Sequence, residues 1–274
     1  MRKVYADYAA TTPLCLAARM AMMQAFDTYG NPSSLHQTGV EARNLVEEAR
    51  AKVAKAINAE PDEIYFTSGA TEANNWALYF GMCWVSEIEH DSLTSKCFPG
   101  LISDGSGVIK DIVRSSIIPT PHTISVGMVN NEVGTVQDVK YWGEFAHSRN
   151  ELLHTDATQA VGHIPVDVKE LGADLLSMSA HKFGGPKGVG VLFVRRGVDI
   201  LPLLHGGHQE AGKRPGTENV IGIVGMGAAI EWAVSKLDES VPYLTRLREK
   251  LTDGILDIPG VCLLYTSPSP RDCS

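Results

Sequence analysis

The sequence has no long hydrophobic run, no excess of positive charge and no secretion signal. No apolar stretch approaches the roughly 20 residues that a membrane-spanning helix requires, and residues 1–14 lack the apolar core of a signal peptide. The formal net charge is -8 and the basic residues are scattered, which argues against binding to nucleic acid or to an anionic membrane. We therefore expect a cytoplasmic protein that acts on small molecules.

Paired cysteine motifs are also missing. The cysteines are irregularly spaced and no two of them form a CxxC pair: Cys15, Cys83, Cys97, Cys262 and Cys273. Zinc sites and disulfide frameworks depend on such patterns, so we expect reduced thiols. The segment HGGH, with His205 and His208, has no partner cluster, and we expect no metal site.

What the chain does have is an alternation of apolar strands and amphipathic helices. Its 274 residues, 44% of them hydrophobic, suit one large domain or one domain plus part of another. The periodicity predicts helices and strands in alternation. The helices are expected at 37–58, 69–80, 139–149, 218–237 and 241–256, and the strands at 63–68, 87–90, 122–129, 151–155, 173–179 and 189–196. This order indicates a mostly parallel α/β sheet, whose sites lie at the carboxyl ends of the strands.

One lysine lies at such a strand end. In SAHKFGGPKGVG, residues 179–190, Lys182 follows a predicted strand and enters a glycine-rich bend. Glycines let the backbone approach a ligand closely, and a lysine in a partly desolvated pocket has a lowered pKa and becomes a nucleophilic amine. Because most loop lysines are simply solvated, this segment alone leaves both interpretations open.

Polar residues follow three other predicted strands. Ala70 and Thr71 open a helix in TSGATEANN, where free N–H groups favour an anion; an ordinary N-cap is the alternative, and neither a P-loop nor a GxGxxG motif is present. Asp156 and Gln159, in HTDATQAVG, suit a protonated heteroaromatic nitrogen and a phenolate oxygen, or a helix cap. His90 could stack on an aromatic ring or be a core histidine.

Together these residues supply the groups that pyridoxal phosphate requires. Lys182 provides an amine, Asp156 a partner for the ring nitrogen, Gln159 a donor to the ring oxygen and His90 a stacking imidazole. A phosphate cradle completes the set, formed by Thr71 with Ser179 and His181.

The sequence also resembles the cysteine desulfurases of the class V aminotransferase group, the NifS/IscS-like enzymes, from YADYAATTPL to about DIPGV. The shared motifs occur in order: GNPSSLHQTG, FTSGATEANN, IEH, VNNEVGTVQD, HTDATQAVG, SAHKFGGPKGVG and HGGHQEAGKRPGTEN. The resemblance implies the α/β architecture of fold-type I pyridoxal phosphate-dependent transferases, with a mostly parallel central sheet flanked by helices. It also implies a homodimer with its sites at the subunit interface.

The resemblance assigns a role to each matching position. Lys182 is implied to bind the cofactor covalently, Asp156 to hold the pyridine nitrogen, Gln159 the ring hydroxyl, and His90 to lie over the ring. Contacts to the cofactor phosphate and its surroundings fall on Ala70, Thr71, Ser179, His181 and Asn131, with Thr217 reaching the phosphate of the neighbouring subunit. Asn31 and His36 are implied to line the pocket entrance.

The implied reaction converts L-cysteine to L-alanine and leaves the sulfur as a persulfide on an enzyme cysteine. Sulfur-acceptor or scaffold proteins would then receive it for iron–sulfur cluster or thio-cofactor assembly. The family's nucleophilic cysteine lies in a small-residue loop near the C-terminus, and its substrate-binding arginine lies further on. Neither motif is found here, because the recognisable sequence stops near Val261.

We therefore expect a C-terminally truncated chain. Residues 1–235 would form the cofactor-binding large domain, 236–261 the start of the small C-terminal domain, and 262–274 a non-native tail. The segments on either side of His90 are shorter than is usual in the family, so one element of the large domain is expected to be trimmed. Alternatives are a catalytically dead cofactor-binding or dimerisation fragment, a selenocysteine lyase or another class V enzyme.

Overall fold

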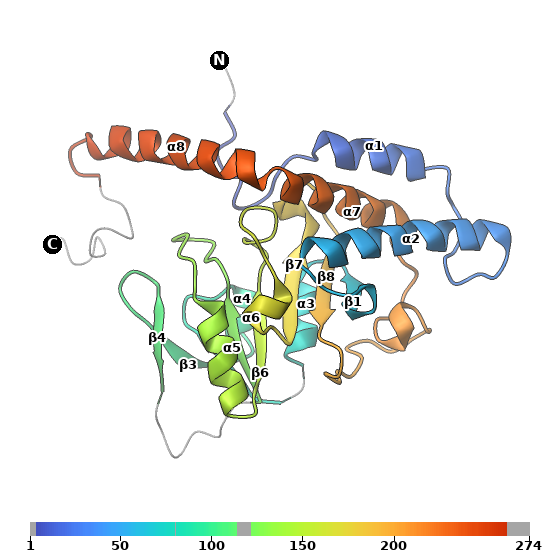
Figure 1. The fold of residues 1–274 in the computed structure, drawn as a ribbon, viewed down its shortest axis with the longest axis horizontal. Helices are drawn as coiled ribbons and strands as arrows, with labels where there is room; N and C mark the ends of the chain where they lie inside the picture. Colours follow the sequence, from blue (N-terminus) through green and yellow to red (C-terminus); the bar gives the residue numbers. More distant parts are fainter. Residues whose placement is uncertain (1–3, 80, 114–121, 262–274) are drawn as a thin grey trace.

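A computed structural model describes residues 4–79, 81–113 and 122–261 (Figure 1). The helices are α1 (Leu16–Ala25), α2 (Gln37–Ala56), α3 (Ala70–Ala77), α4 (Asp91–Thr94), α5 (Val139–Ser148), α6 (Val168–Leu171), α7 (Val220–Ser235) and α8 (Leu237–Leu256). The strands are β1 (Ile64–Thr67), β2 (Cys83–Ser86), β3 (Phe98–Ser103), β4 (Ile109–Ile112), β5 (Thr123–Gly127), β6 (Leu152–Asp156), β7 (Leu175–Ser179) and β8 (Gly190–Val194). The predicted tail, with Cys262 and Cys273, lies outside the described residues.

The strands form one eight-stranded sheet in the order β1-β8-β7-β6-β5-β2-β3-β4. The central neighbours β7, β6, β5, β2 and β3 run parallel, while β8 is antiparallel to both β1 and β7, and β4 is antiparallel to β3. The expected mostly parallel α/β sheet is confirmed. Because β1 and β7 are both antiparallel to β8, the carboxyl ends of β1, β2, β5, β6 and β7 lie at one edge.

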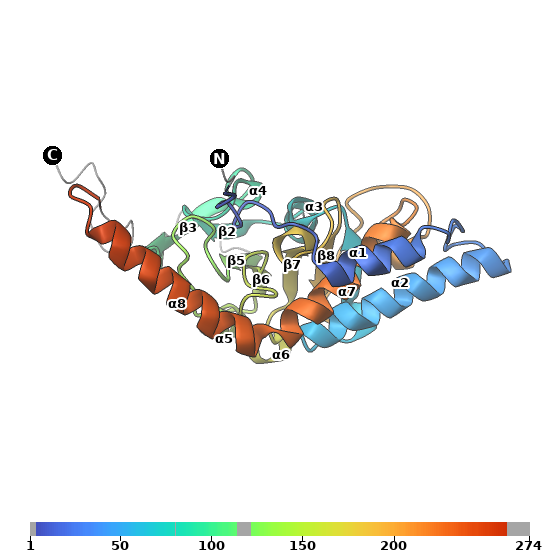
Figure 2. The same ribbon diagram turned by 90° about the horizontal axis from the view of Figure 1, so that it is seen from above.

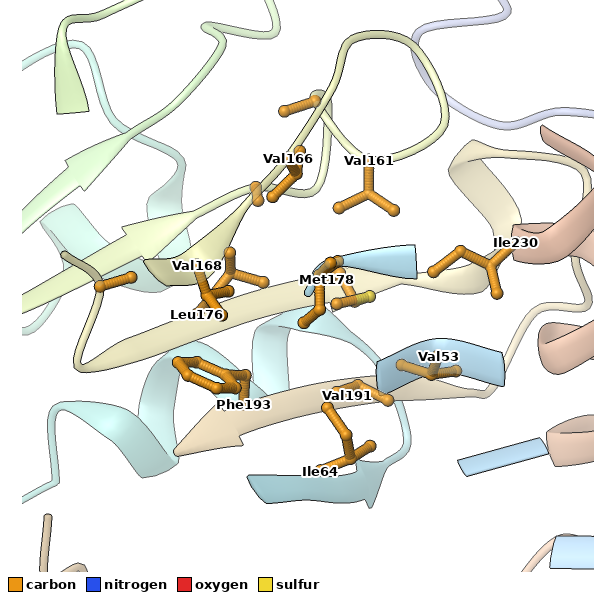
Figure 3. Packing of buried hydrophobic residues seen from close by; sticks show 14 of the residues in the cluster. Val53, Ile64, Val161, Val166, Val168, Leu176, Met178, Val191, Phe193 and Ile230 are labelled. Carbon is orange, nitrogen blue, oxygen red and sulfur yellow. The ribbon is translucent and has the colours of Figure 1, made fainter. Parts of the chain in front are cut away.

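Helices cover both faces of the sheet (Figures 1 and 2). On one face α2, α5 and α7 pack on the strands, and Figure 3 shows Leu176, Met178, Val191 and Phe193 of β7 and β8 in contact with this layer. On the other face α3 and α4 pack on Leu175 and Leu192. Alternate residues of the central strands are thus buried on opposite faces, which explains their continuous apolar runs.

The short strands were the least predictable part. The strand expected at 87–90 is wrong: β2 lies at Cys83–Ser86, and 87–90 form the turn that leads into α4. The strands β3 and β4 and the helix α1 were not predicted, because β3 contains a proline and a glycine, β4 has two charged residues at its centre, and the apolar residues of α1 follow no clear period. Cys83 therefore lies in a buried strand.

The expectation that all cysteines are reduced is also wrong. Cys83 of β2 and Cys97, which follows α4, form a disulfide with Cα atoms 5.0 Å apart. Their sequence separation of 14 matches no known motif, and only the return of the chain beside β2 brings them together. Among the described cysteines, Cys15 is a free thiol.

The last two helices meet at a sharp bend. α7 is buried between α1 and α2, whereas α8 extends beyond the sheet and exposes most of its side chains (Figures 1 and 2). Within the described residues no single helix is long and apolar enough to cross a membrane; α7 and α8 meet that criterion only as a pair, bent by 71°.

Candidate functional site

A cavity of about 750 Å³ opens at the edge of the sheet where the parallel strands end. Most residues that the sequence singled out line it, although they come from distant parts of the chain: Ala70, Thr71, His90, Asn131, Asp156, Gln159, Ser179, His181 and Lys182. This gathering follows from the topology, because the carboxyl ends of parallel strands meet at one edge.

Lys182 ends the short helix η2 (Ala180–Lys182), directly after β7. Its ammonium donates to the carbonyl oxygens of Ala9, at 2.5 Å, and Ala10, at 3.1 Å. Burial lowers the pKa of the Lys182 amine, and the nearby Asp156 and Asp7 carboxylates oppose this effect only in part. A lowered pKa makes the free amine more available as a nucleophile and base.

Asp156 ends β6, the strand next to β7. One carboxylate oxygen, Oδ1, accepts a hydrogen bond from the Thr158 N–H at 2.9 Å, and the other, Oδ2, accepts one from the Asn74 side chain at 2.7 Å. Each oxygen keeps a lone pair, so the oriented carboxylate can accept a further N–H from a ligand in the cavity.

The first turn of α3 lines the cavity with its helix start. Its N-cap is Gly69, which has no side chain to occupy the free N–H groups. A Cβ at Gly190 would approach the Gly69 backbone to 2.6 Å, so the pairing of β8 with this turn requires glycine. Ser179 and His181 line the same end of the cavity. Burial and the adjacent Lys182 and Lys187 lower the pKa of His181, and the His181 ring nitrogen Nδ1 contacts the Thr11 hydroxyl at 3.1 Å.

His90 is the N-cap of α4 and not the end of a strand. The Ser92 backbone N–H donates to His90 Nδ1 at 3.1 Å, and the Ser92 hydroxyl lies 2.8 Å from the same nitrogen. Because Nδ1 is an acceptor, the neutral ring carries its proton on Nε2. The ring is exposed to the cavity and is free to stack on a planar ligand.

Sequence reasoning missed the contribution of the N-terminal segment. Residues 7–12 lie across the loop of Lys182: the Thr12 N–H and hydroxyl both donate to the His181 carbonyl oxygen, and the Gly184 N–H donates to the Thr12 hydroxyl. The Gln159 amide donates to Ala9. In the sequence, the motif YADYAATTP is the signal that corresponds to these contacts.

Three sequence-predicted residues lie elsewhere in this single chain. Thr217 follows the helix η3 (Glu210–Gly212), Asn31 lies in the loop between α1 and α2, and His36 caps the start of α2. None of them lines the cavity. Among the described residues no group of three or more His, Cys, Asp or Glu could hold a metal ion.

Two titratable groups lie beside Asp156: Glu89, which is half-buried and lines the cavity, and His154, which is fully buried. Glu89 accepts a hydrogen bond from the Gly127 N–H at 2.8 Å; burial, with the Asp156 charge, raises its pKa to about 7 from 4.5. His154 lies on β6 with both ring nitrogens bonded to hydroxyls, those of Ser125 and Ser177; burial lowers its pKa to about 4 from 6.5, although the Asp156 charge opposes this.

Glu89 and His154 should make the free energy of unfolding depend on pH in opposite directions. Between pH 4.5 and 7 folded Glu89 holds a proton that the unfolded chain has lost, so its contribution falls as pH rises. Between pH 6.5 and 4 the unfolded chain binds a proton that folded His154 does not, so its contribution falls as pH falls. Each effect amounts to about 3 kcal/mol at its limit.

We predict that Glu89→Gln removes the first effect. In urea unfolding of the cofactor-free protein, the free energy of the variant minus that of the parent should rise by about 3 kcal/mol between pH 4.5 and 7. The matched control is Glu87→Gln, because Glu87 is exposed and only two residues away. If the free energy of unfolding of each variant differs from that of the parent by the same amount at every pH, Glu89 is not protonated in the folded protein.

The donor set fits pyridoxal phosphate. The cavity presents an amine, an oriented carboxylate and a helix start with free N–H groups, which match an aldehyde, a pyridine nitrogen and a phosphate. In addition, the buried Thr158 hydroxyl has no hydrogen-bond partner within the described part of the chain, although Thr158 lines the cavity. A polar ligand would satisfy this group.

Comparison with known proteins agrees with this geometry. The model of the aminotransferase class-V family matches residues 4–89 and 101–274. A cysteine desulfurase IscS of Dictyoglomus turgidum is 46% identical over 269 residues, which cover 90% of this chain and 68% of the relative. The cysteine desulfurase IscS of Methanosarcina thermophila is 43% identical, over 94% of this chain and 69% of its own length.

Solved structures share the fold. A NifS-like protein, 37% identical, superposes with a TM-score of 0.88 over 93% of this chain and 76% of its own. The NifS-like protein from Rickettsia africae, 29% identical, gives 0.90 over 98% and 79%. The match of the family model is interrupted at 90–100, the segment that contains α4.

Proposed function

Because the chain belongs to the aminotransferase class-V family, and within it to the cysteine desulfurases, we propose that it converts L-cysteine to L-alanine with pyridoxal 5'-phosphate held in the cavity. The supporting observation is the placement of Lys182 and Asp156 at the ends of the adjacent strands β7 and β6, with the pKa of the Lys182 amine lowered by burial. These are the two groups on which the chemistry of this cofactor depends.

When bound, pyridoxal phosphate supplies an electron sink for negative charge at the substrate Cα. Lys182 would hold the cofactor through Nζ, and its amine would move the proton at the substrate Cα. The Asp156 carboxylate would keep a proton on the ring nitrogen. Gln159 would donate to the ring hydroxyl, and the His90 imidazole would contact the ring.

The remaining residues bind and orient. The start of α3, with Ala70 and Thr71, would hold the phosphate together with Ser179 and His181, and Asn131 would contact the substrate; all of these residues line the cavity. In a homodimer, Thr217 of one subunit would reach the phosphate of the other, and Asn31 and His36 would line the entrance.

The sulfur step needs a thiol. The substrate C–S bond breaks and a sulfur–sulfur bond forms, so that one L-cysteine and one enzyme thiol give one L-alanine and one enzyme persulfide. Acceptor or scaffold proteins then take the sulfur for iron–sulfur cluster or thio-cofactor assembly. Cys15, the free thiol among the described cysteines, does not line the cavity, so we do not assign it this role.

A second candidate is a protein that binds the cofactor or dimerises without turnover, and the absence of a described cysteine from the cavity wall favours it. A selenocysteine lyase or another class V enzyme would share Lys182 and Asp156. Alanine release from L-cysteine, compared with release from L-selenocysteine, distinguishes these candidates.

The test is to purify the protein with pyridoxal phosphate, record the visible band of the lysine-bound cofactor, reduce it with borohydride and map the labelled peptide. We expect the label on Lys182, whereas Lys187, the other lysine that lines the cavity, should remain unlabelled. Addition of L-cysteine should release alanine and form persulfide in equal amounts. The absence of a visible band would contradict the cofactor assignment, and a band without alanine would support the second candidate.

A further inference from the structure

Asn74 lies at the centre of a hydrogen-bond chain that joins two sides of the cavity. It is on α3 and is 1% exposed. One N–H of its amide group donates to Asp156 Oδ2 at 2.7 Å, and the same Nδ2 donates to the Ser92 hydroxyl at 2.9 Å. That hydroxyl in turn lies 2.8 Å from His90 Nδ1. The chain therefore runs from Asp156 through Asn74 and Ser92 to His90.

The orientation of the Asn74 amide follows from the chemistry of its partners. An ionised carboxylate only accepts hydrogen bonds, so the amide must present its NH₂ group to Asp156. Both amide protons are then used, and the carbonyl oxygen, Oδ1, is buried without a hydrogen-bond partner among the described residues. A buried unpaired acceptor lowers the stability of the fold. The two hydrogen bonds that the Asn74 amide donates, to Asp156 and to Ser92, offset this cost.

We propose that Asn74 is a positioning residue of the cofactor site, which fixes the Asp156 carboxylate for the ring nitrogen and, through Ser92, fixes the proton of His90 on Nε2. This inference rests on the proposed function, since it assumes that Asp156 holds a ring nitrogen. Asn74 itself does not touch the reacting atoms. Asn74 binds Asp156 Oδ2, and the Thr158 N–H binds the other oxygen, Oδ1, at 2.9 Å. The two hydrogen bonds together restrict the Asp156 carboxylate to one orientation.

The charges around Asp156 make the role of Asn74 testable by pH. Lys182 faces Asp156 from the loop after β7, Glu89 from the turn after β2, and His154 from β6 itself. Replacing Asn74 by aspartate places a second carboxyl group against the Asp156 oxygen. Two carboxyl groups at this distance share one proton and lose it as pH rises, so the loss of cofactor binding should grow with pH.

The experiment measures the dissociation constant of pyridoxal phosphate by its visible band and by tryptophan fluorescence, at pH 6 and pH 9, each relative to the parent protein. Asn74→Leu removes both donors at similar volume and should weaken binding by about tenfold to a hundredfold at both pH values. Asn74→Asp should weaken binding more at pH 9 than at pH 6. The matched control is Asn75→Leu, since the half-buried Asn75 amide donates to the Thr71 carbonyl on the same helix and not to Asp156, and it should change the constant by less than about threefold.

The second link has a separate readout in the cofactor-free protein. In ¹⁵N spectra of the histidine side chains, Asn74→Leu and Ser92→Ala should each shift the Nδ1 signal of His90, whereas Asn75→Leu should not. The proposal is overturned if Asn74→Leu matches Asn75→Leu in cofactor affinity, or if Asn74→Asp loses the same factor at both pH values. A parent protein with no visible band would instead contradict the proposed function.

Discussion

Replacing Lys182 by alanine will reduce the rate of alanine formation from L-cysteine at least about a thousandfold, because one amine serves as both cofactor anchor and proton carrier. The visible band of the lysine-bound cofactor should disappear as well. Steady-state alanine release and an absorption spectrum of the purified protein measure the two effects.

The matched control for this prediction is Lys187→Ala. Lys187 lines the same cavity but is exposed, and it lies beyond Gly184 and Gly185, whereas Lys182 ends the short helix η2 directly after β7. We expect this variant to retain the visible band and to lose less than about tenfold in rate. Equal loss of the band in both variants, or retention of the band in Lys182→Ala, would show that the covalent anchor has been assigned to the wrong lysine.

Arg50→Met should lower the free energy of unfolding by about 3–5 kcal/mol, the largest stability effect that we expect for a single substitution. The guanidinium of Arg50 forms two hydrogen bonds to the Glu210 carboxylate, at 2.8 and 2.9 Å, and only 3% of the Glu210 side chain is exposed. Without Arg50 a buried charge remains unpaired, and the hydrogen bond from the Phe66 N–H, at 2.9 Å, is the one that remains among the described residues. Urea unfolding of the cofactor-free protein measures the loss.

An exposed ion pair of the same type is the control. Arg196 binds Asp62 through two nitrogens, but their side chains are 68% and 63% exposed. Arg196→Met should therefore cost no more than about 1 kcal/mol. Adding Glu210→Gln to Arg50→Met should recover part of the loss, because the amide carries no charge. Similar losses for the two arginine variants would contradict a special role for burial.

The sequence predicted most strands of the sheet but not the positions of β2, β3 and β4. The long helices α2 and α7 and the strands β6, β7 and β8 were recognisable, because their apolar periodicity extends over many residues or is continuous on both faces. In contrast β2 lies before its predicted position, and β3 and β4 lack a clear strand pattern, because β3 contains Pro99 and Gly100 and β4 has two charged residues at its centre. The Cys83–Cys97 disulfide was missed because it depends on the return of the chain beside β2.

The sequence by itself determined the chemistry of the site. Lys182, Asp156 and the start of α3 each follow a strand that local patterns predicted, whereas His90 caps the unpredicted helix α4; the ordered motifs around all of them indicated the family. The tertiary structure decided what surrounds them: the carbonyl oxygens of Ala9 and Ala10 on Lys182, the Asn74 amide on Asp156, and the burial of Glu89 and His154. These contacts join segments up to 173 residues apart, and burial and charge are shared properties of the folded chain, so no local pattern could reveal them.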